Sequence, residues 1–252
     1  MSKRIRLKIA YDGSAYHGYQ IQDGQVTVEG VLTEAVREAT SEDTDLIGAS
    51  RTDAGVHALG NIVVFDTDSP IPADKFFMVL NKLLPDDISV ISSDEVPSDW
   101  HPRKQDCKKT YEYRIYMSPV RIPTKRLYAH YTYNTLDIGE MNRAAGVFKG
   151  EHDFSAFCAA GSQAVSFTRT IYDCSVRQEG ADAVISVTGN GFLYNMVRII
   201  AGTLMDVGLG RKNADDIASI IDSCDRRAAG PTLPACGLTL IGYDYGENHK
   251  KS

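Results

Sequence analysis

Hydrophobic and polar residues alternate along the first strand-length segment of the chain, residues 4–11, where most of the polar positions are basic. Because successive side chains of a strand point to opposite faces, this pattern predicts a half-buried strand that ends at the turn-forming pair Asp12-Gly13. The alternation returns over residues 110–117 and predicts a second such strand. Other apolar patterns predict strands over residues 45–50 and 61–67, a hairpin over residues 170–188 that turns near Glu179-Gly180, and a last strand over residues 238–245.

Helical spacing of apolar residues follows the first strand. From Val28 to Ala39 these residues recur at i, i+3, i+4, i+7, i+8 and i+11, and Thr27 precedes them as an N-cap. A second helix is predicted from Ala73 to Leu84, between Pro72 and Pro85. Further helices are predicted over residues 136–148, 193–207 and 214–223, the last of them capped by Asn213.

This succession of strands and helices predicts an α+β fold of two related lobes. We expect a mostly antiparallel mixed central sheet with flanking helices. The N-terminal lobe is expected to comprise residues 1–105 and the C-terminal lobe residues 106–252, with the seam near residues 100–107.

The composition is typical of a folded protein, because 252 residues with 43% hydrophobic and 24% charged residues can bury a sizeable core. No signal peptide or membrane span is visible in the sequence. Five cysteines are scattered without a C-x-x-C pair, so the sequence gives no basis for a disulfide framework or a cysteine zinc site. A reducing cytoplasm fits this pattern best.

The net charge of −6 argues at first against a polyanionic partner. The distribution of charge changes that view, since residues 101–130 hold eight basic residues and two acidic ones. Such a run is often only a solvated face. Four tyrosines interleave with these cations, however, and this combination favours nucleic-acid binding.

The octapeptide Arg51-Thr52-Asp53-Ala54-Gly55-Val56-His57-Ala58 lies between two predicted strands. Loops at strand ends often carry catalytic residues, and this one offers a cation, a carboxylate and an imidazole in Arg51, Asp53 and His57. Asp close to Gly is also common in turns, so a structural role for Asp53 stays open on these residues alone. The other histidines supply no second motif at zinc spacing, which argues against a metal site.

Three further positions each have a functional and an ordinary interpretation. Tyr111 lies between cations, although a lone strand tyrosine is more often a cross-strand aromatic. Arg198 interrupts an apolar helix, where a buried arginine needs a carboxylate or similar partner, although it could instead extend along the helix surface. Leu238, after Gly237, is most simply a core residue.

In combination, these motifs resemble the tRNA pseudouridine synthase A family over nearly the whole chain. The motifs that carry the resemblance are Tyr11-Asp12-Gly13-Ser14 with Tyr16, Gly18 and Gln20, the octapeptide at Arg51, Tyr111 with Tyr113-Arg114, Met196-Val197-Arg198 with Gly202, and Gly237-Leu238. They stand in the family's order and at about its spacings. The family usually has tryptophan where this chain has Tyr19.

The resemblance implies the pseudouridine synthase fold, a homodimer, a basic cleft for the tRNA anticodon arm, and no cofactor or metal. The implied reaction isomerises uridine to pseudouridine at tRNA positions 38, 39 and 40. Asp53 matches the catalytic aspartate and Arg198 its basic partner. Arg51 matches the arginine that helps displace the target nucleotide, Tyr111 the aromatic that stacks on the uracil, and Leu238 an apolar wall of the pocket.

Two other functions stay open on the sequence. A noncatalytic RNA-binding module could use the same basic, tyrosine-rich strand, and it predicts that Asp53 is dispensable. An aspartate-dependent glycosyl hydrolase would also place a carboxylate in a cleft. That class normally needs a second catalytic carboxylate, and none stands in a comparable motif here.

Overall fold

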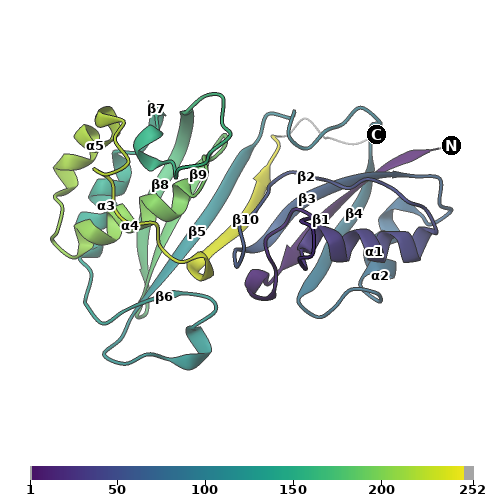
Figure 1. The fold of residues 1–252 in the computed structure, drawn as a ribbon, viewed down its shortest axis with the longest axis horizontal. Coiled ribbons are helices and arrows are strands. Elements are labelled where there is room, and N and C mark those ends of the chain that lie inside the picture. The colour runs from purple at the N-terminus through teal and green to yellow at the C-terminus, as the bar shows by residue number, and fades with distance from the viewer. Residues whose placement is uncertain (1, 247–252) are drawn as a thin grey trace. The chain divides into compact units, whose positions relative to one another are not determined.

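The protein is described from a computed structural model, in which residues 2–246 are placed. These residues form two compact units (Figure 1). Unit 1 contains residues 2–107 together with residues 240–246, and unit 2 contains residues 108–239. The expected α+β fold with mostly antiparallel strands is confirmed.

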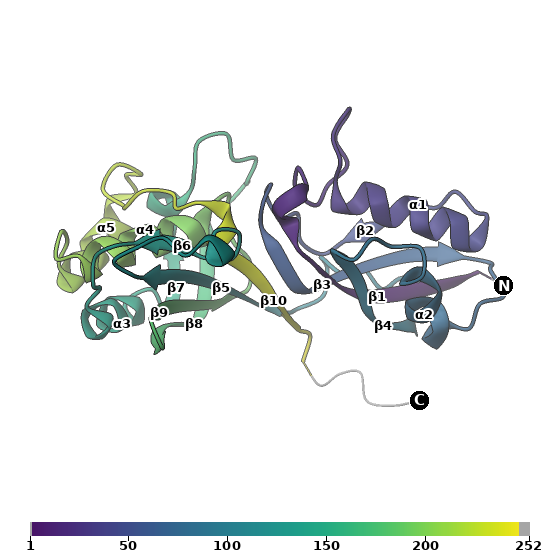
Figure 2. The same cartoon turned by 90° about the horizontal axis from the view of Figure 1, so that it is seen from below.

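Unit 1 is built on an antiparallel sheet in the order β4-β1-β3, with the short β2 paired to β3. Its strands are β1 (Lys3–Tyr11), β2 (Ile47–Gly48), β3 (His57–Thr67) and β4 (Ile88–Val96), and its helices are α1 (Val28–Thr40) and α2 (Phe76–Leu80). Figure 2 shows α1 running along one face of these strands.

The first strand and the first helix form as the sequence predicts. Ile5, Leu7 and Ile9 are fully buried on one face of β1, while the basic residues between them lie on the other. The α1 helix begins after Thr27, whose hydroxyl accepts a hydrogen bond from Gly30 N at 3.2 Å. That bond satisfies one of the N–H groups left over at a helix start.

Unit 2 has the antiparallel strand order β5-β9-β8-β7, with β6 parallel to β5. The strands are β5 (Lys108–Met117), β6 (His130–Thr132), β7 (Gly150–Asp153), β8 (Thr168–Glu179) and β9 (Asp182–Gly189). The helices are α3 (Ile138–Gly146), α4 (Met196–Gly208) and α5 (Ile217–Ser223), of which α3 packs on β8 and on α4. The predicted hairpin is confirmed, and Gly180 turns it with a positive φ of 60°.

Several short elements complete the two units. The last strand, β10 (Leu238–Asp244), begins in unit 2 and continues in unit 1, where Gly60 of β3 approaches its residue Ile241. Short 3-10 helices span Gly13–Ala15, Ala73–Lys75, Pro123–Lys125, Ser155–Phe157, Ala214–Asp216 and Ala235–Gly237. No helix within residues 2–246 is both long enough and apolar enough to cross a membrane.

The bounds of some helices and strands, and of the two units, differ from those predicted. The helix expected over residues 73–84 is a 3-10 turn followed by α2, which ends at Leu80. The side chain of the next residue, Asn81, bonds to both backbone groups of Val90. The expected strand over residues 45–50 keeps only the two residues of β2. β3 begins earlier, at His57. Residues 240–246 pack with unit 1, whereas the expected boundary put the entire C-terminal segment in one lobe.

Candidate active-site residues

The sequence-predicted site residues lie in both units. Arg51 and Asp53 belong to unit 1, and Tyr111, Arg198 and Leu238 belong to unit 2. Each group is described within its own unit.

In unit 1, the octapeptide leaves the sheet as a tight loop. Ala49 N donates to Ile62 O at 2.7 Å, and the chain then departs from β3. Val56 N donates to Asp53 O at 3.1 Å, which closes a turn around Gly55 with its φ of 78°. Arg51 is exposed and Asp53 half-buried. The loop therefore presents a cation and a carboxylate at its rim.

A second segment, residues 11–19, packs against this loop. A Cβ added at Gly13 would overlap the carbonyl oxygen of Val56, so the two backbones can approach only because residue 13 is glycine. Tyr19 N donates to Thr52 O at 3.0 Å. The hydroxyl of Tyr11 lies 2.7 Å from Thr52 Oγ1. The conformation of the loop is therefore set by residues distant in sequence.

His57 has a structural position in unit 1. It is 5% exposed and is the first residue of β3. Its Nδ1 lies 3.2 Å from Gly13 N and 3.1 Å from Asp12 Oδ1, so the ring faces the turn at residues 12–13. Within the octapeptide, His57 therefore stands in a strand, whereas Arg51 and Asp53 stand in the loop.

A second arginine, Arg103, lies beside the loop and close to Arg51. Arg103 Nε donates to Gly48 O at 2.7 Å, which fixes the guanidinium at the end of β2. Burial, and next the positive charge of Arg51, lowers the pKa of Arg103, so the two cations are close enough to influence one another. Neighbouring cations of this kind can bind a phosphate backbone.

Tyr111 lies in the middle of β5, paired with Val187 of β9. It is 9% exposed, and its ring meets that of Phe192 edge-on with a centroid distance of 5.3 Å. Edge-to-face packing restrains a ring without covering both of its faces. The aromatic plane is therefore held in a defined orientation.

Arg198 lies in the first turn of α4 and is half-buried. Its Nε donates to Leu233 O at 2.7 Å and its Nη1 to Asn195 Oδ1 at 2.6 Å. Asn195 takes the left-handed conformation, with a φ of 59°, just before the helix begins. The guanidinium is therefore bonded to Leu233 and Asn195. An arginine that simply extended along the helix surface would not need these bonds.

The segment that bonds to Arg198 is itself fixed to α4. A Cβ at Gly202 would overlap Pro231 O, and Thr203 Oγ1 accepts from Gly230 N at 2.8 Å. The same segment leads through Gly237 to Leu238, which is 6% exposed. Gly202 and the Thr203 hydroxyl thus let the segment at Gly230 and Pro231 lie directly on α4.

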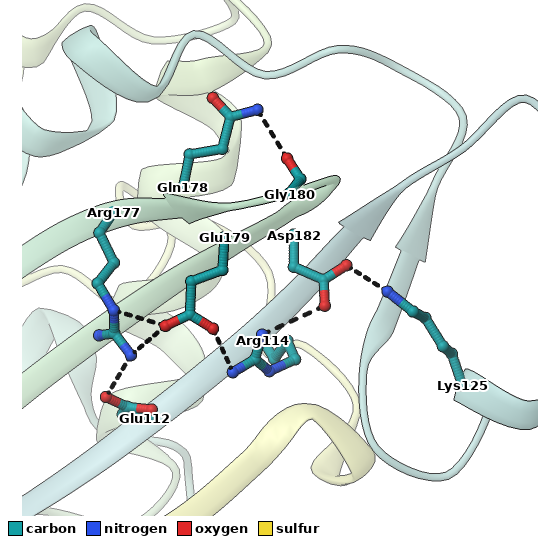
Figure 3. A network of polar contacts seen from close by, with 8 residues as sticks. All are labelled: Glu112, Arg114, Lys125, Arg177, Gln178, Glu179, Gly180 and Asp182. Carbon is teal, nitrogen blue, oxygen red and sulfur yellow. Dashed lines mark hydrogen bonds and ion pairs between the residues drawn. The ribbon is translucent and has the colours of Figure 1, made fainter.

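Part of the basic stretch at residues 101–130 is engaged inside unit 2. Arg114 bonds to Glu179 and Asp182, with N–O distances of 2.9 and 3.2 Å, and Lys125 bonds to Asp182 at 2.6 Å. Figure 3 shows these residues and their contacts. Arg177 joins Glu112 and Glu179 in the same network. The expectation that these cations serve nucleic acid is therefore weaker for Arg114 and Lys125 than for the rest of the stretch.

The sequence analysis assigned no role to the residues that support the loop. Tyr11 and Thr52 stand in motifs without a role of their own, and Asn61 stands only at the start of a predicted strand. One signal was present, because Asn61 is a lone polar residue beside the apolar run Ile62–Phe65. Among residues 2–246, no group of three or more potential metal ligands lies together.

Comparison with known proteins gives the family. The family model described as "tRNA pseudouridine synthase" matches residues 8–103 and 144–246. tRNA pseudouridine synthase A of Ruminiclostridium cellulolyticum is 48% identical over 244 residues, which cover 96% of this chain and 100% of that protein. The protein of the same name from Acetivibrio thermocellus is 47% identical over 243 residues, with 96% and 100% covered.

Among solved structures, the archaeal box H/ACA sRNP Nop10-Cbf5 complex matches 94% of this chain and 46% of the other at 10% identity, with a TM-score of 0.33, which is too low to support an argument. The family model and the full-length relatives carry the assignment. The chain belongs to the tRNA pseudouridine synthase family.

Proposed function

We propose that this protein isomerises uridine to pseudouridine in the anticodon arm of tRNA, at positions 38, 39 and 40, with Asp53 as the catalytic carboxylate. The observation that carries the proposal is the end-to-end similarity to proteins named tRNA pseudouridine synthase A. Asp53 is half-buried on a loop that backbone hydrogen bonds hold in place, and this position supports its role as the catalytic carboxylate.

The reaction explains why a carboxylate is needed. Pseudouridine forms when the C1′–N1 bond breaks, the uracil turns, and C5 joins C1′. Positive character develops on the sugar as the bond breaks, and a carboxylate stabilises it, as at glycosidase centres. The hydrogen on C5 leaves as a proton and N1, released from C1′, gains a proton, so the reaction is balanced without an oxidant, a reductant or a second substrate.

The other site residues receive roles that match their chemistry. A target base must leave the stack, which costs a few kcal/mol. Insertion of Arg51 and stacking on Tyr111 offset that cost. A neighbouring arginine favours the charged form of a carboxylate, and Arg198 has this role toward Asp53 in the proposal. Leu238 forms an apolar wall for the base.

The proposal extends to the assembly and its setting. Unit 1 acts as the lobe with the catalytic loop, and unit 2 as the lobe with the stacking tyrosine and the arginine. We expect a homodimer that works in the cytoplasm without cofactor or metal. The family similarity and the scattered cysteines support these expectations.

Release of tritium tests the proposal. Unmodified tRNA transcribed with [5-³H]uridine loses tritium to water when C5 joins C1′, and chelator in the reaction removes metal ions. Wild-type protein should release tritium, and the nearly isosteric Asp53→Asn variant should bind the tRNA without releasing it. Release by Asp53→Asn at the wild-type rate would overturn the assignment. Binding without release by the wild type would favour the RNA-binding module.

A further inference from the structure

Asn61 is a fully buried polar residue at the point where the catalytic loop leaves the sheet. Its Oδ1 accepts hydrogen bonds from Ser50 N at 3.2 Å and Ile62 N at 2.9 Å, and its Nδ2 donates to Ser50 O at 3.0 Å. The side chain thus satisfies both backbone groups of Ser50, as a neighbouring strand would. β2 can end, and the loop can diverge, without leaving these buried groups unsatisfied.

A second contact links Asn61 to the residue next to Asp53. Asn61 Nδ2 lies 3.4 Å from the hydroxyl of Tyr11, which lies 2.7 Å from Thr52 Oγ1. An amide nitrogen can only donate, so the tyrosine oxygen accepts from Asn61. In the bond between Tyr11 and Thr52, either hydroxyl can be the donor. The first contact is long and weak, and the second is of ordinary length. Both lie among buried residues.

These bonds fix the loop on both sides of Arg51. Ser50 is held through its backbone, and Thr52 through its side chain and through its carbonyl oxygen, which accepts from Tyr19 N. Arg51 between them is exposed, and Asp53 follows directly. A carboxylate must be held close to its productive position, because a displacement of about 1 Å can cost roughly 100-fold in rate.

We propose that Asn61 and Tyr11 are positioning residues of the reaction, which place Asp53 by holding Ser50 and Thr52. The proposal rests on the proposed function, in which Asp53 is the catalytic carboxylate. It makes the conformation of the loop, and with it the turnover rate, depend on two buried side chains that lie outside the loop.

The Thr52 hydroxyl offers a matched pair of variants. Thr52→Val has nearly the same shape but no hydroxyl, whereas Thr52→Ser keeps the hydroxyl. Thr52→Val should lower kcat for tRNA by about 10-fold or more while KM changes little. The loop keeps its fold, but Asp53 is no longer held in its productive position. Thr52→Ser should recover most of the lost kcat. Equal kcat values for Thr52→Val and wild type would overturn the proposal for Tyr11.

Asn81 provides a control for Asn61. It binds Val90 in the same way, with Nδ2 donating to Val90 O at 2.9 Å and Oδ1 accepting from Val90 N at 2.7 Å, but it is exposed and lies directly after α2. Asn61→Leu should lower kcat and speed hydrogen exchange of the amides at residues 50–56. Asn81→Leu should leave kcat and exchange in that segment unchanged. Unchanged kcat and exchange in Asn61→Leu would overturn the proposal for Asn61.

The same experiment separates this proposal from the proposed function. Asp53→Asn is assayed beside the other variants. If Asp53→Asn is inactive and Thr52→Val and Asn61→Leu are fully active, the function stands and the positioning proposal falls. If Asp53→Asn is active, the catalytic assignment falls, and with it a positioning role in the reaction. The exchange measurement then still decides whether Asn61 holds the loop.

Discussion

The Tyr19 hydroxyl gives a sharp test of how unit 1 is packed. The side chain is 1% exposed, and its hydroxyl has no hydrogen-bond partner among the described residues. Burial, and next the charge of Glu29, raises the pKa of Tyr19 well above its usual value. Substitution by phenylalanine keeps the ring, which packs against Gly48, and removes only the unsatisfied oxygen.

The expected size of the effect follows from that environment. Burying a hydroxyl without a hydrogen bond costs about 1 to 3 kcal/mol, and Tyr19→Phe removes this cost. The space left by one oxygen is smaller than a methyl group and costs less than about 1 kcal/mol. The free energy of unfolding should therefore rise by about 1 to 2 kcal/mol. For a chain of this length, that raises Tm by roughly 2 to 8 °C.

Scanning calorimetry measures this change, and Tyr113→Phe is the matched control. Tyr113 is also fully buried, but its hydroxyl donates to Pro234 O at 2.8 Å. Its removal leaves a carbonyl without that donor and should lower stability by about 1 kcal/mol or more. A fall in Tm for Tyr19→Phe would refute the reasoning, because it would show that the Tyr19 hydroxyl makes a stabilising interaction.

Three further predictions follow from the same structure. Gly13→Ala should push the Val56 backbone away and lower turnover by at least about 10-fold, which a rate assay measures; wild-type turnover would contradict the close approach. Burial raises the pKa of Tyr113, whereas an unfolded tyrosine ionises near pH 10, so stability should fall as pH rises above about 10; an equal urea midpoint at pH 8.5 and 10.5 would contradict this. Burial raises the pKa of the Cys174 thiol to about 12, so a disulfide reagent should modify the exposed Cys224 and spare Cys174 in the folded protein; rapid modification of Cys174 would contradict its burial.

The elements with a regular apolar period could be predicted from the sequence. The strand at residues 4–11 and the helix after Thr27 form because their own spacing creates an apolar face. The strand predicted over residues 45–50 is present only as the two residues of β2, and its early end could not be predicted, since it depends on the side chain of Asn61. The pairing of Arg114 with Asp182 also depends on the register of β5 against β9, which no local pattern reveals.

In the candidate site, too, local motifs could be recognised from the sequence, whereas contacts between distant residues could not. Arg51 and Asp53 stand in one motif and could be singled out directly. The contacts that support them could not be predicted, because Tyr11 lies 41 residues from Thr52 and 50 from Asn61 in sequence. Hydrogen bonds over such separations appear only once the strands have paired.

The most direct test of the account maps pseudouridine itself. Purified protein is incubated with unmodified tRNA and chelator, and the RNA is treated with carbodiimide, which leaves a stable adduct on pseudouridine that stops primer extension. We predict stops at uridines 38, 39 and 40 with the wild type and none with Asp53→Asn, which should still bind the tRNA. The same stops with Asp53→Asn, or none with a wild-type protein that binds the tRNA tightly, would contradict the account.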